Sequence, residues 1–160
     1  MNGTYLDLLT QLARADVQFV LIGGYACIVH GGTQTTEDID VCCDFTPENL
    51  LRLQEAIAGF NPVHRMTPRR PPLSLTPENC RDYKNLYLDT ALGQLDCVSV
   101  VQGLGDFNAV QSMCETIEAE GVQFKVLDID ALIQSKKSMN RPRDQEAVRQ
   151  LEAIKKLEGK

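Results

Sequence analysis

Residues 20–41 read VLIGGYACIVHGGTQTTEDIDV, and the order of the parts in this stretch decides the fold. An apolar run over residues 17–22 predicts a buried strand, which stops at Gly23-Gly24. An apolar stretch over residues 25–30 then predicts a short helix, which a second glycine pair ends. After a polar loop, residues 38–42 alternate as a strand does. The stretch therefore predicts a strand, a glycine turn, a helix, a loop and a second strand.

Two carboxylates on the second of these strands indicate a cation site. Side chains two residues apart on a strand share a face, so Asp38 and Asp40 point the same way. Because like charges repel, a fold that sets them side by side usually needs a compensating cation. Mg2+ is typically held by one or two carboxylates together with substrate phosphates. The Gly23-Gly24 turn lets backbone N–H groups approach an anion at a helix N-terminus. The stretch therefore favours a site for a nucleoside triphosphate.

At these residues the chain resembles the nucleotidyltransferase superfamily, which has the polymerase-beta-like fold. Members show Gly-Gly or Gly-Ser, a short helix, then Asp-x-Asp, with a third carboxylate on a later strand. Here thirteen residues, 25–37, separate Gly24 from Asp38, which is within the family's range. The closer resemblance is to small prokaryotic members, many of them toxin halves of toxin–antitoxin pairs. Those often read Arg-x-Thr-x-Asp-Ile-Asp, whereas this chain has Gln34 at the arginine position. This departure leaves the metal ligands Asp38 and Asp40 intact, but it removes the arginine that could contact phosphate from position 34.

A later hairpin carries the candidates for the third carboxylate. Residues 86–90 and 94–100 alternate on either side of a glycine turn, which predicts two antiparallel strands. Asp96 stands between apolar neighbours, so its carboxylate must be paired, bound to a metal, or protonated. Its position matches the family's third carboxylate. Asp89 on the other strand of the hairpin is the second candidate.

The last third of the chain predicts two helices, over residues 131–137 and 142–157. In the small nucleotidyltransferases that the chain resembles, a helix ending in lysine precedes an Arg-Pro-Lys-Asp-like turn and a final helix. The matching residues are Lys136 and then Arg141-Pro142-Arg143-Asp144. The resemblance implies that Lys136 contacts triphosphate, while Asp144, at a helix start, is expected to cap or pair locally.

A second Asp-x-Asp, Asp128-Ile129-Asp130, has a structural interpretation. No glycine pair leads into it, and an apolar helical stretch follows. We therefore expect Asp128 to be a helix N-cap and Asp130 a first-turn acid that the helix dipole favours.

Length predicts one domain, and the resemblance implies an α+β fold in two layers, with a mixed sheet flanked by helices and a C-terminal helical pair. The chain has 160 residues, 43% of them hydrophobic, which is enough for a core. The core is expected over residues 1–127 and the C-terminal helices over 128–158. No run approaches the about 18 apolar residues of a membrane span, so no membrane partner is expected and the cytoplasm is the default location. The six cysteines show no C-x-x-C pair and are expected to be reduced and buried.

Net charge is −6, which argues against general affinity for nucleic acid. Basic residues nevertheless cluster in two segments, 65–70 and 136–143, where phosphates could bind or where the loops are simply solvated. The first cluster falls within residues 61–82, a proline-rich stretch that predicts a long irregular loop or a short edge strand. Loops of this length are more often functional than inert, so a lid or an acceptor-binding loop is expected.

Together the motifs predict a metal-dependent nucleotidyltransferase that uses a nucleoside triphosphate such as ATP. One Mg2+ or Mn2+ would be held by Asp38, Asp40 and Asp96, and a second by Asp38 and Asp40. Gly23 and Gly24 would bind phosphate through backbone N–H groups, and Lys136 would stabilise developing charge. Thr36 is placed either to touch phosphate or to cap the loop. The acceptor would be an RNA end such as tRNA, a protein or a small molecule.

Two other classes stay open on the sequence. The first is a non-catalytic nucleotide- or RNA-binding member of the same fold, for which Gln34 is the hint. The second is an interaction module whose activity appears after release from an antitoxin partner, with the arginines of residues 65–70 as the candidate contact.

Overall fold

The structure is a computed structural model that describes residues 3–159. Its centre is a seven-stranded mixed sheet in the order β3-β4-β5-β2-β1-β9-β8. The strands are β1 (Phe19–Ile22), β2 (Asp38–Cys43), β3 (Val63–His64), β4 (Asn85–Thr90), β5 (Gly93–Val98), β8 (Cys114–Ala119) and β9 (Val122–Leu127). β2 runs parallel to β5 and β1 parallel to β9, and the other neighbours are antiparallel. The predicted α+β class with a mixed sheet is confirmed.

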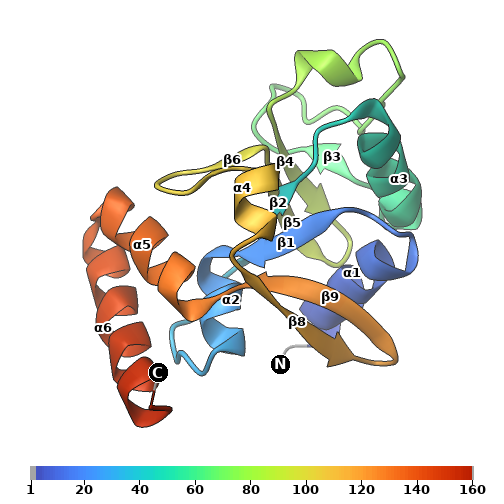
Figure 1. The fold of residues 1–160 in the computed structure, drawn as a ribbon. Helices are drawn as coiled ribbons and strands as arrows, with labels where there is room; N and C mark the ends of the chain where they lie inside the picture. Colours follow the sequence, from blue (N-terminus) through green and yellow to red (C-terminus); the bar gives the residue numbers. More distant parts are fainter. Residues whose placement is uncertain (1–2, 160) are drawn as a thin grey trace.

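Within residues 3–159, six α-helices flank this sheet. They are α1 (Gly3–Arg14), α2 (Gly23–Val29), α3 (Pro47–Ile57), α4 (Phe107–Gln111), α5 (Ile129–Met139) and α6 (Pro142–Leu157). Two short 3-10 turns, Ala58–Phe60 and Cys80–Asp82, and a small hairpin of β6 (Val100–Val101) and β7 (Gly105–Asp106) complete the described elements. α5 and α6 lie against each other on one side of the molecule, where α5 also contacts α2 (Figure 1). The predicted C-terminal helical pair is therefore present.

Local signals in the sequence fix several of these boundaries. The Thr46 hydroxyl accepts a hydrogen bond from the Asn49 N–H at 3.3 Å, and Pro47 is the first residue of α3, the usual pattern of a helix start. Glu120 and Gly121 both have positive φ, 51° and 79°, which suits the two-residue turn between β8 and β9. β8 and β9 therefore form a tight antiparallel hairpin.

The first strand is shorter than the sequence predicts. Residues 17–22 form an apolar run, but β1 begins at Phe19. The Val17 N–H donates to the Leu12 carbonyl at 3.1 Å, and the Gln18 N–H donates to Asn49 Oδ1 at 2.7 Å. The backbone N–H groups of Val17 and Gln18 therefore form hydrogen bonds with partners outside the sheet, and the strand begins after them. α2, in turn, begins at Gly23 and not at residue 25, so the glycine pair is the first turn of the helix.

The proline-rich stretch 61–82 contains both a loop and a short edge strand. β3 is two residues long and lies at the edge of the sheet beside β4. Residues 62–73, called here the arginine segment, fold back on themselves, because the His64 N–H donates to the Pro71 carbonyl and the Leu73 N–H to the Pro62 carbonyl. In Figure 1 the green loops of this region project beyond β3 and α3.

All six cysteines are free, and five of them are buried. Within residues 3–159, no helix combines the length and the apolar character that crossing a membrane requires.

Candidate active site

The three predicted carboxylates meet on two neighbouring strands. In the parallel pairing of β2 with β5, Asp40 lies directly opposite Asp96, and Asp38 is two residues before Asp40 on the same face. One oxygen atom of each of the three carboxylates lies within 4.8 Å of the others. Asp89, the second candidate for the third carboxylate, is absent from this group and pairs with Arg70 instead. We call Asp38, Asp40 and Asp96 the carboxylate cluster.

The glycine turn lies against this cluster at a distance that only glycine permits. Ile22, the last residue of β1, pairs with Asp40, so Gly23 follows immediately beside the Asp40 side chain. Gly23 has a φ of +72°, and a Cβ there would lie 2.4 Å from Asp40 Oδ2. Both the left-handed backbone and the close approach therefore require glycine.

Thr36 shapes the loop that leads into β2. Its hydroxyl donates to the Asp38 carbonyl at 3.1 Å, and it also stands near Gly24, whose Cβ, if added, would lie 3.1 Å from Thr36 Oγ1. The Tyr5 hydroxyl donates to the Thr36 carbonyl at 3.5 Å. The loop-capping alternative predicted for Thr36 is thus present, while its contact with phosphate stays a prediction.

The cluster carries more negative charge than its surroundings neutralise. Burial, together with the charges of Asp96 and Asp38, raises the pKa of Asp40 to about 6. Burial and the charge of Asp96 also raise the pKa of Asp38. A divalent cation would remove this repulsion, and three converging carboxylate oxygens are the ligands that Mg2+ and Mn2+ favour. The residues present therefore fit such an ion.

Arg65 is the residue of this site whose partner the sequence did not reveal. Its guanidinium forms a two-pronged ion pair with Asp96, in which Nη1 donates to Oδ1 and Nη2 donates to Oδ2 at 2.9 Å. Backbone pairing places Arg65 beside Asp96. The Arg65 N–H donates to the carbonyl of Tyr87 on β4, and Tyr87 lies opposite Asp96 of β5. The sequence does indicate that a buried carboxylate on an interior strand needs a partner. It does not indicate which of the three arginines of the segment is that partner, because this depends on how the segment folds.

Basic residues of the C-terminal helices form the wall opposite the cluster. Lys136 Nζ lies 3.6 Å from Asp144 Oδ1, and Arg141 Nε donates to Asp144 Oδ2 at 2.6 Å. Burial raises the pKa of the Asp144 carboxyl, but the hydrogen bonds from Arg141 and the charge of Lys136 outweigh it and leave that pKa lowered. The prediction that Asp144 pairs locally is confirmed. The negative charge of Asp144 thus holds the side chains of Lys136 and Arg141 in place.

Three comparisons bear on this arrangement. No family model matches the chain, and a search of curated proteins finds no match. Solved structures do match. LnuA, a lincosamide antibiotic adenylyltransferase in its lincomycin-bound form, is 14% identical with a TM-score of 0.61, over 96% of this chain and 98% of that chain. ANT(2'')-Ia in complex with adenylyl-2''-tobramycin is 14% identical with a TM-score of 0.58, over 98% and 95%. A protein of Thermotoga maritima assigned as a nucleotidyltransferase is 17% identical with a TM-score of 0.57, over 93% and 92%.

The chain has the nucleotidyltransferase fold. The fold that the resemblance in the glycine pair and Asp-x-Asp implied is thereby confirmed. The identities are low, so the likeness concerns the fold.

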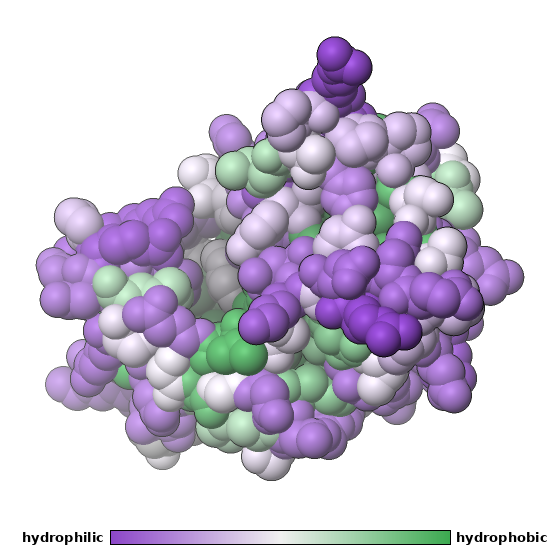
Figure 2. Space-filling view, turned by 90° about the horizontal axis from the view of Figure 1, so that it is seen from above, coloured by the Kyte–Doolittle hydropathy of each residue, from purple (hydrophilic) through white to green (hydrophobic). Residues whose placement is uncertain are grey.

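In this nucleotidyltransferase fold, the cluster and the basic wall share one cavity of about 790 Å³. All seven residues predicted for the site line it: Gly23, Gly24, Thr36, Asp38, Asp40, Asp96 and Lys136. Gln34, Arg141 and Arg143 also line it, and the Gln34 side chain donates to the Arg143 carbonyl at 3.3 Å. Figure 2 shows a hollow between the lobe of the C-terminal helices and the main body, with hydrophobic residues at its edge. The apolar part of the lining includes Val98, Val101 and Leu132.

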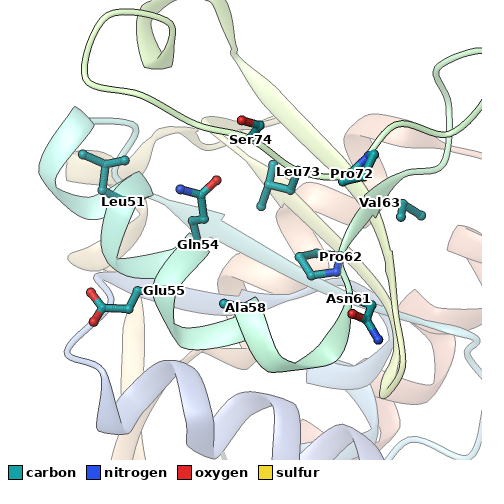
Figure 3. A pocket seen from close by; sticks show the side chains of 10 residues that line it. All are labelled: Leu51, Gln54, Glu55, Ala58, Asn61, Pro62, Val63, Pro72, Leu73 and Ser74. Atoms are coloured by element: carbon teal, nitrogen blue, oxygen red, sulfur yellow. The ribbon is translucent and has the colours of Figure 1, made fainter.

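A second cavity of the fold, about 710 Å³, has a different character. It lies between α3 and the arginine segment and is lined largely by apolar residues, with Leu51, Pro62 and Leu73 among them (Figure 3). Glu55 is its one charged residue. It lacks the carboxylates and basic groups that the chemistry of a triphosphate requires.

Proposed function

We propose that the protein is a metal-dependent nucleotidyltransferase, which transfers a nucleoside monophosphate from a nucleoside triphosphate to a hydroxyl-bearing acceptor. The observation that carries the proposal is the carboxylate cluster, set beside a glycine turn and facing a basic wall across one cavity. The fold shared with adenylyltransferases supports it.

The cluster would hold the divalent cation, Mg2+ or Mn2+, through Asp38 and Asp40 with Asp96 as the third ligand. When bound, such an ion lowers the pKa of the acceptor hydroxyl and neutralises the triphosphate. In the reaction, a bond forms between the acceptor oxygen and the alpha phosphorus while the bond from that phosphorus to pyrophosphate breaks. The hydroxyl proton leaves to a carboxylate or to water, and the pyrophosphate carries away the displaced electron pair.

The residues around the cluster would position the triphosphate. The Gly23-Gly24 turn, which lines the cavity beside Asp40, would offer its backbone N–H groups to phosphate, and Lys136 would offer a cation from the facing wall. Arg143 could supply the positive charge that Gln34 lacks. The Gln34 side chain donates to the Arg143 carbonyl, and both residues line the same cavity. The missing arginine at position 34 is therefore a weak argument for a non-catalytic protein.

The acceptor side of the proposal favours a small hydroxyl compound. LnuA was solved with lincomycin and ANT(2'')-Ia with adenylyl-2''-tobramycin, so antibiotics are acceptors or ligands of proteins with this fold. Apart from the cluster itself, the charged residues that line the cavity of this chain are Lys136, Arg141 and Arg143, all basic. An RNA end or a protein remains the alternative acceptor.

A role as the toxin of a toxin–antitoxin pair is a further proposal, which rests on the motif resemblance alone. It requires an antitoxin that binds this chain tightly. Co-expression with the product of the neighbouring gene, followed by size-exclusion chromatography, tests it: separate elution of the two proteins and unchanged growth on expression of this chain alone would argue against it.

Transfer of label from alpha-labelled nucleoside triphosphates, with Mg2+ or Mn2+, tests the enzyme. The purified protein is incubated with each nucleotide and with small hydroxyl compounds, a cell extract or no acceptor. Asp38→Asn/Asp40→Asn should abolish labelling. Asp130→Asn, which alters the other Asp-x-Asp, is the matched control and should label as the wild type does.

Two negative outcomes are informative. Nucleotide binding without label transfer in any of these mixtures would support the non-catalytic alternative. Equal labelling by the wild type and the double variant would show that the activity does not come from the carboxylate cluster.

A further inference from the structure

The three carboxylates of the cluster are not equally available to a cation. Arg65 engages both oxygens of Asp96, and the two side chains are only 18% and 11% exposed. Within residues 3–159, by contrast, no ion pair is found for the carboxylates of Asp38 or Asp40. A cation can therefore reach Asp38 and Asp40 directly, but it meets a guanidinium at Asp96.

We propose that Arg65 competes with a divalent cation for Asp96. The cluster then has a first cation position on Asp38 and Asp40, and a second position, shared with Asp96, that opens only when the Arg65 side chain withdraws. The inference rests on the cation-binding part of the proposed function and is independent of nucleotidyl transfer.

Arg65 has other partners that can hold its side chain once Asp96 is released. Its guanidinium carbon lies 5.7 Å from the centroid of the Tyr87 ring, within the range of a cation–π interaction. Nη1 also donates to the Leu88 carbonyl at 3.4 Å. The backbone N–H of Arg65 donates to the carbonyl of Tyr87 on β4, so the side chain can turn away while the main chain stays beside that strand.

The arginine segment borders a cavity on one side and has an unusual backbone at its turn. Arg69 and Arg70, at its turn, have positive φ values of 66° and 47°, which residues with a Cβ rarely adopt. The cavity of about 710 Å³ lies between α3 and the segment, with Pro62, Val63 and Pro72 on the segment's side (Figure 3). Close packing therefore does not lock the segment from that side.

The size of the competition follows from the charge of Arg65. An arginine paired with an aspartate opposes the binding of another cation to that carboxylate, through its charge and through the hydrogen bonds that must first break. A divalent cation that uses the same carboxylate meets the same positive charge, so removing it should raise the affinity of the second position by about tenfold or more.

Binding of Mn2+ to the nucleotide-free protein tests this, with free Mn2+ followed by electron paramagnetic resonance. The wild type should bind one ion more tightly and a second weakly. Arg65→Gln should tighten the second ion by about tenfold or more. Arg65→Lys, which keeps a positive charge, should lie closer to the wild type. Arg70→Gln is the matched control, since it removes the other ion pair of the same segment, with Asp89, and should bind as the wild type does.

A double-mutant cycle separates competition from disturbed folding. In an Asp96→Asn background, Arg65→Gln should change Mn2+ binding little, because the shared carboxylate is gone. Circular dichroism checks that each variant folds. Unchanged or weaker Mn2+ binding by a folded Arg65→Gln protein would overturn the proposal and make Arg65 a residue that orients Asp96 toward the ion. If the variants bind Mn2+ as expected but no protein transfers label, the proposed function fails while this inference stands.

Discussion

The same tripeptide, Asp-Ile-Asp, occurs twice in this chain, at residues 38–40 and 128–130, with opposite results. On β2 the two acids share one face and converge with Asp96, while Ile39 is buried on the other face. At the start of α5 the two acids find separate partners. The Asp128 side chain accepts from the Ala131 N–H at 2.8 Å, and Asp130 pairs with Lys155. The tripeptide alone therefore does not make a cation site.

The difference comes from what precedes and what faces each copy. Gly23 leaves room beside Asp40, and β5 brings a third carboxylate opposite it. The second copy lies directly after β9 and enters a helix, where an N-cap satisfies a free backbone N–H. On the strand, the two carboxylates lie together with a third, whereas at the helix start the two carboxylates have separate partners. Four predictions test this contrast.

The largest difference should appear when each second aspartate is lengthened. Asp40→Glu keeps the charge but moves the carboxylate by about one bond length, and a displacement of about 1 Å in a catalytic site reduces rates by roughly hundredfold. Asp130→Glu keeps an acid in the first turn of α5, where the dipole still favours it. Label transfer should thus fall by about hundredfold in the first variant and remain unchanged in the second. Similar rates for both would show that the geometry of the cluster is not critical.

The apo-protein should become more stable when the charge of Asp40 is removed. The pKa of Asp40 is raised to about 6 in the folded state, so the folded protein holds a proton that the unfolded chain has lost between about pH 4 and 6. Stability from this group is therefore present at low pH and lost as pH rises through about 6. At pH 8 without divalent cations, Asp40→Asn should stabilise by on the order of 2 kcal/mol, once partial solvent contact is allowed for.

Chemical denaturation at pH 8 and pH 4 measures this effect. The stabilisation should shrink toward zero at pH 4, and excess Mg2+ at pH 8 should favour the wild type. Asp130→Asn, which loses an exposed ion pair with Lys155, serves as the comparison and should change stability little at either pH. A destabilised Asp40→Asn protein at pH 8 would contradict the assigned excess of negative charge.

Replacing the glycine beside Asp40 should separate backbone strain from loss of the site. Gly23 and Gly121 both have positive φ, 72° and 79°, but a Cβ at Gly121 meets nothing within 4 Å. Alanine at either position should therefore destabilise by roughly 1–2 kcal/mol. Only Gly23→Ala should also displace the Asp40 side chain and weaken Mn2+ binding. Equal Mn2+ binding by the two variants would remove the argument for close approach at Gly23.

Most of the fold and the acids of the cluster could be predicted because their signals are local. Alternation placed Asp38, Asp40 and Asp96 on strands, and the capping residue Asp128 marked a helix start. The partner of Asp96 could not be predicted in the same way. Arg65 is 31 residues away, in a segment whose prolines give no period, and its contact depends on how that segment folds over β4.

The contact between Arg143 and Gln34 could not be predicted for a related reason. The sequence placed it in a turn before the last helix, and nothing local shows that this turn reaches the loop of Gln34. The Gln34–Arg143 hydrogen bond and the shared cavity are consequences of how α5 and α6 lie against the rest of the chain. Contacts between distant segments set such details, and patterns within one segment do not report them.

The smallest expected effect concerns the first acid of the second copy. Asp128 caps α5, so Asp128→Ala should destabilise the protein by about 1 kcal/mol, the usual loss for an N-cap. Thermal or chemical unfolding measures it, and Asp128→Ser, which can still accept from the Ala131 N–H, should recover most of the stability. Mn2+ binding should be unchanged in both, because Asp128 is outside the carboxylate cluster. Weaker Mn2+ binding by the stable serine variant would mean that the second copy also contributes to a cation site, and the distinction between strand and helix start would no longer hold.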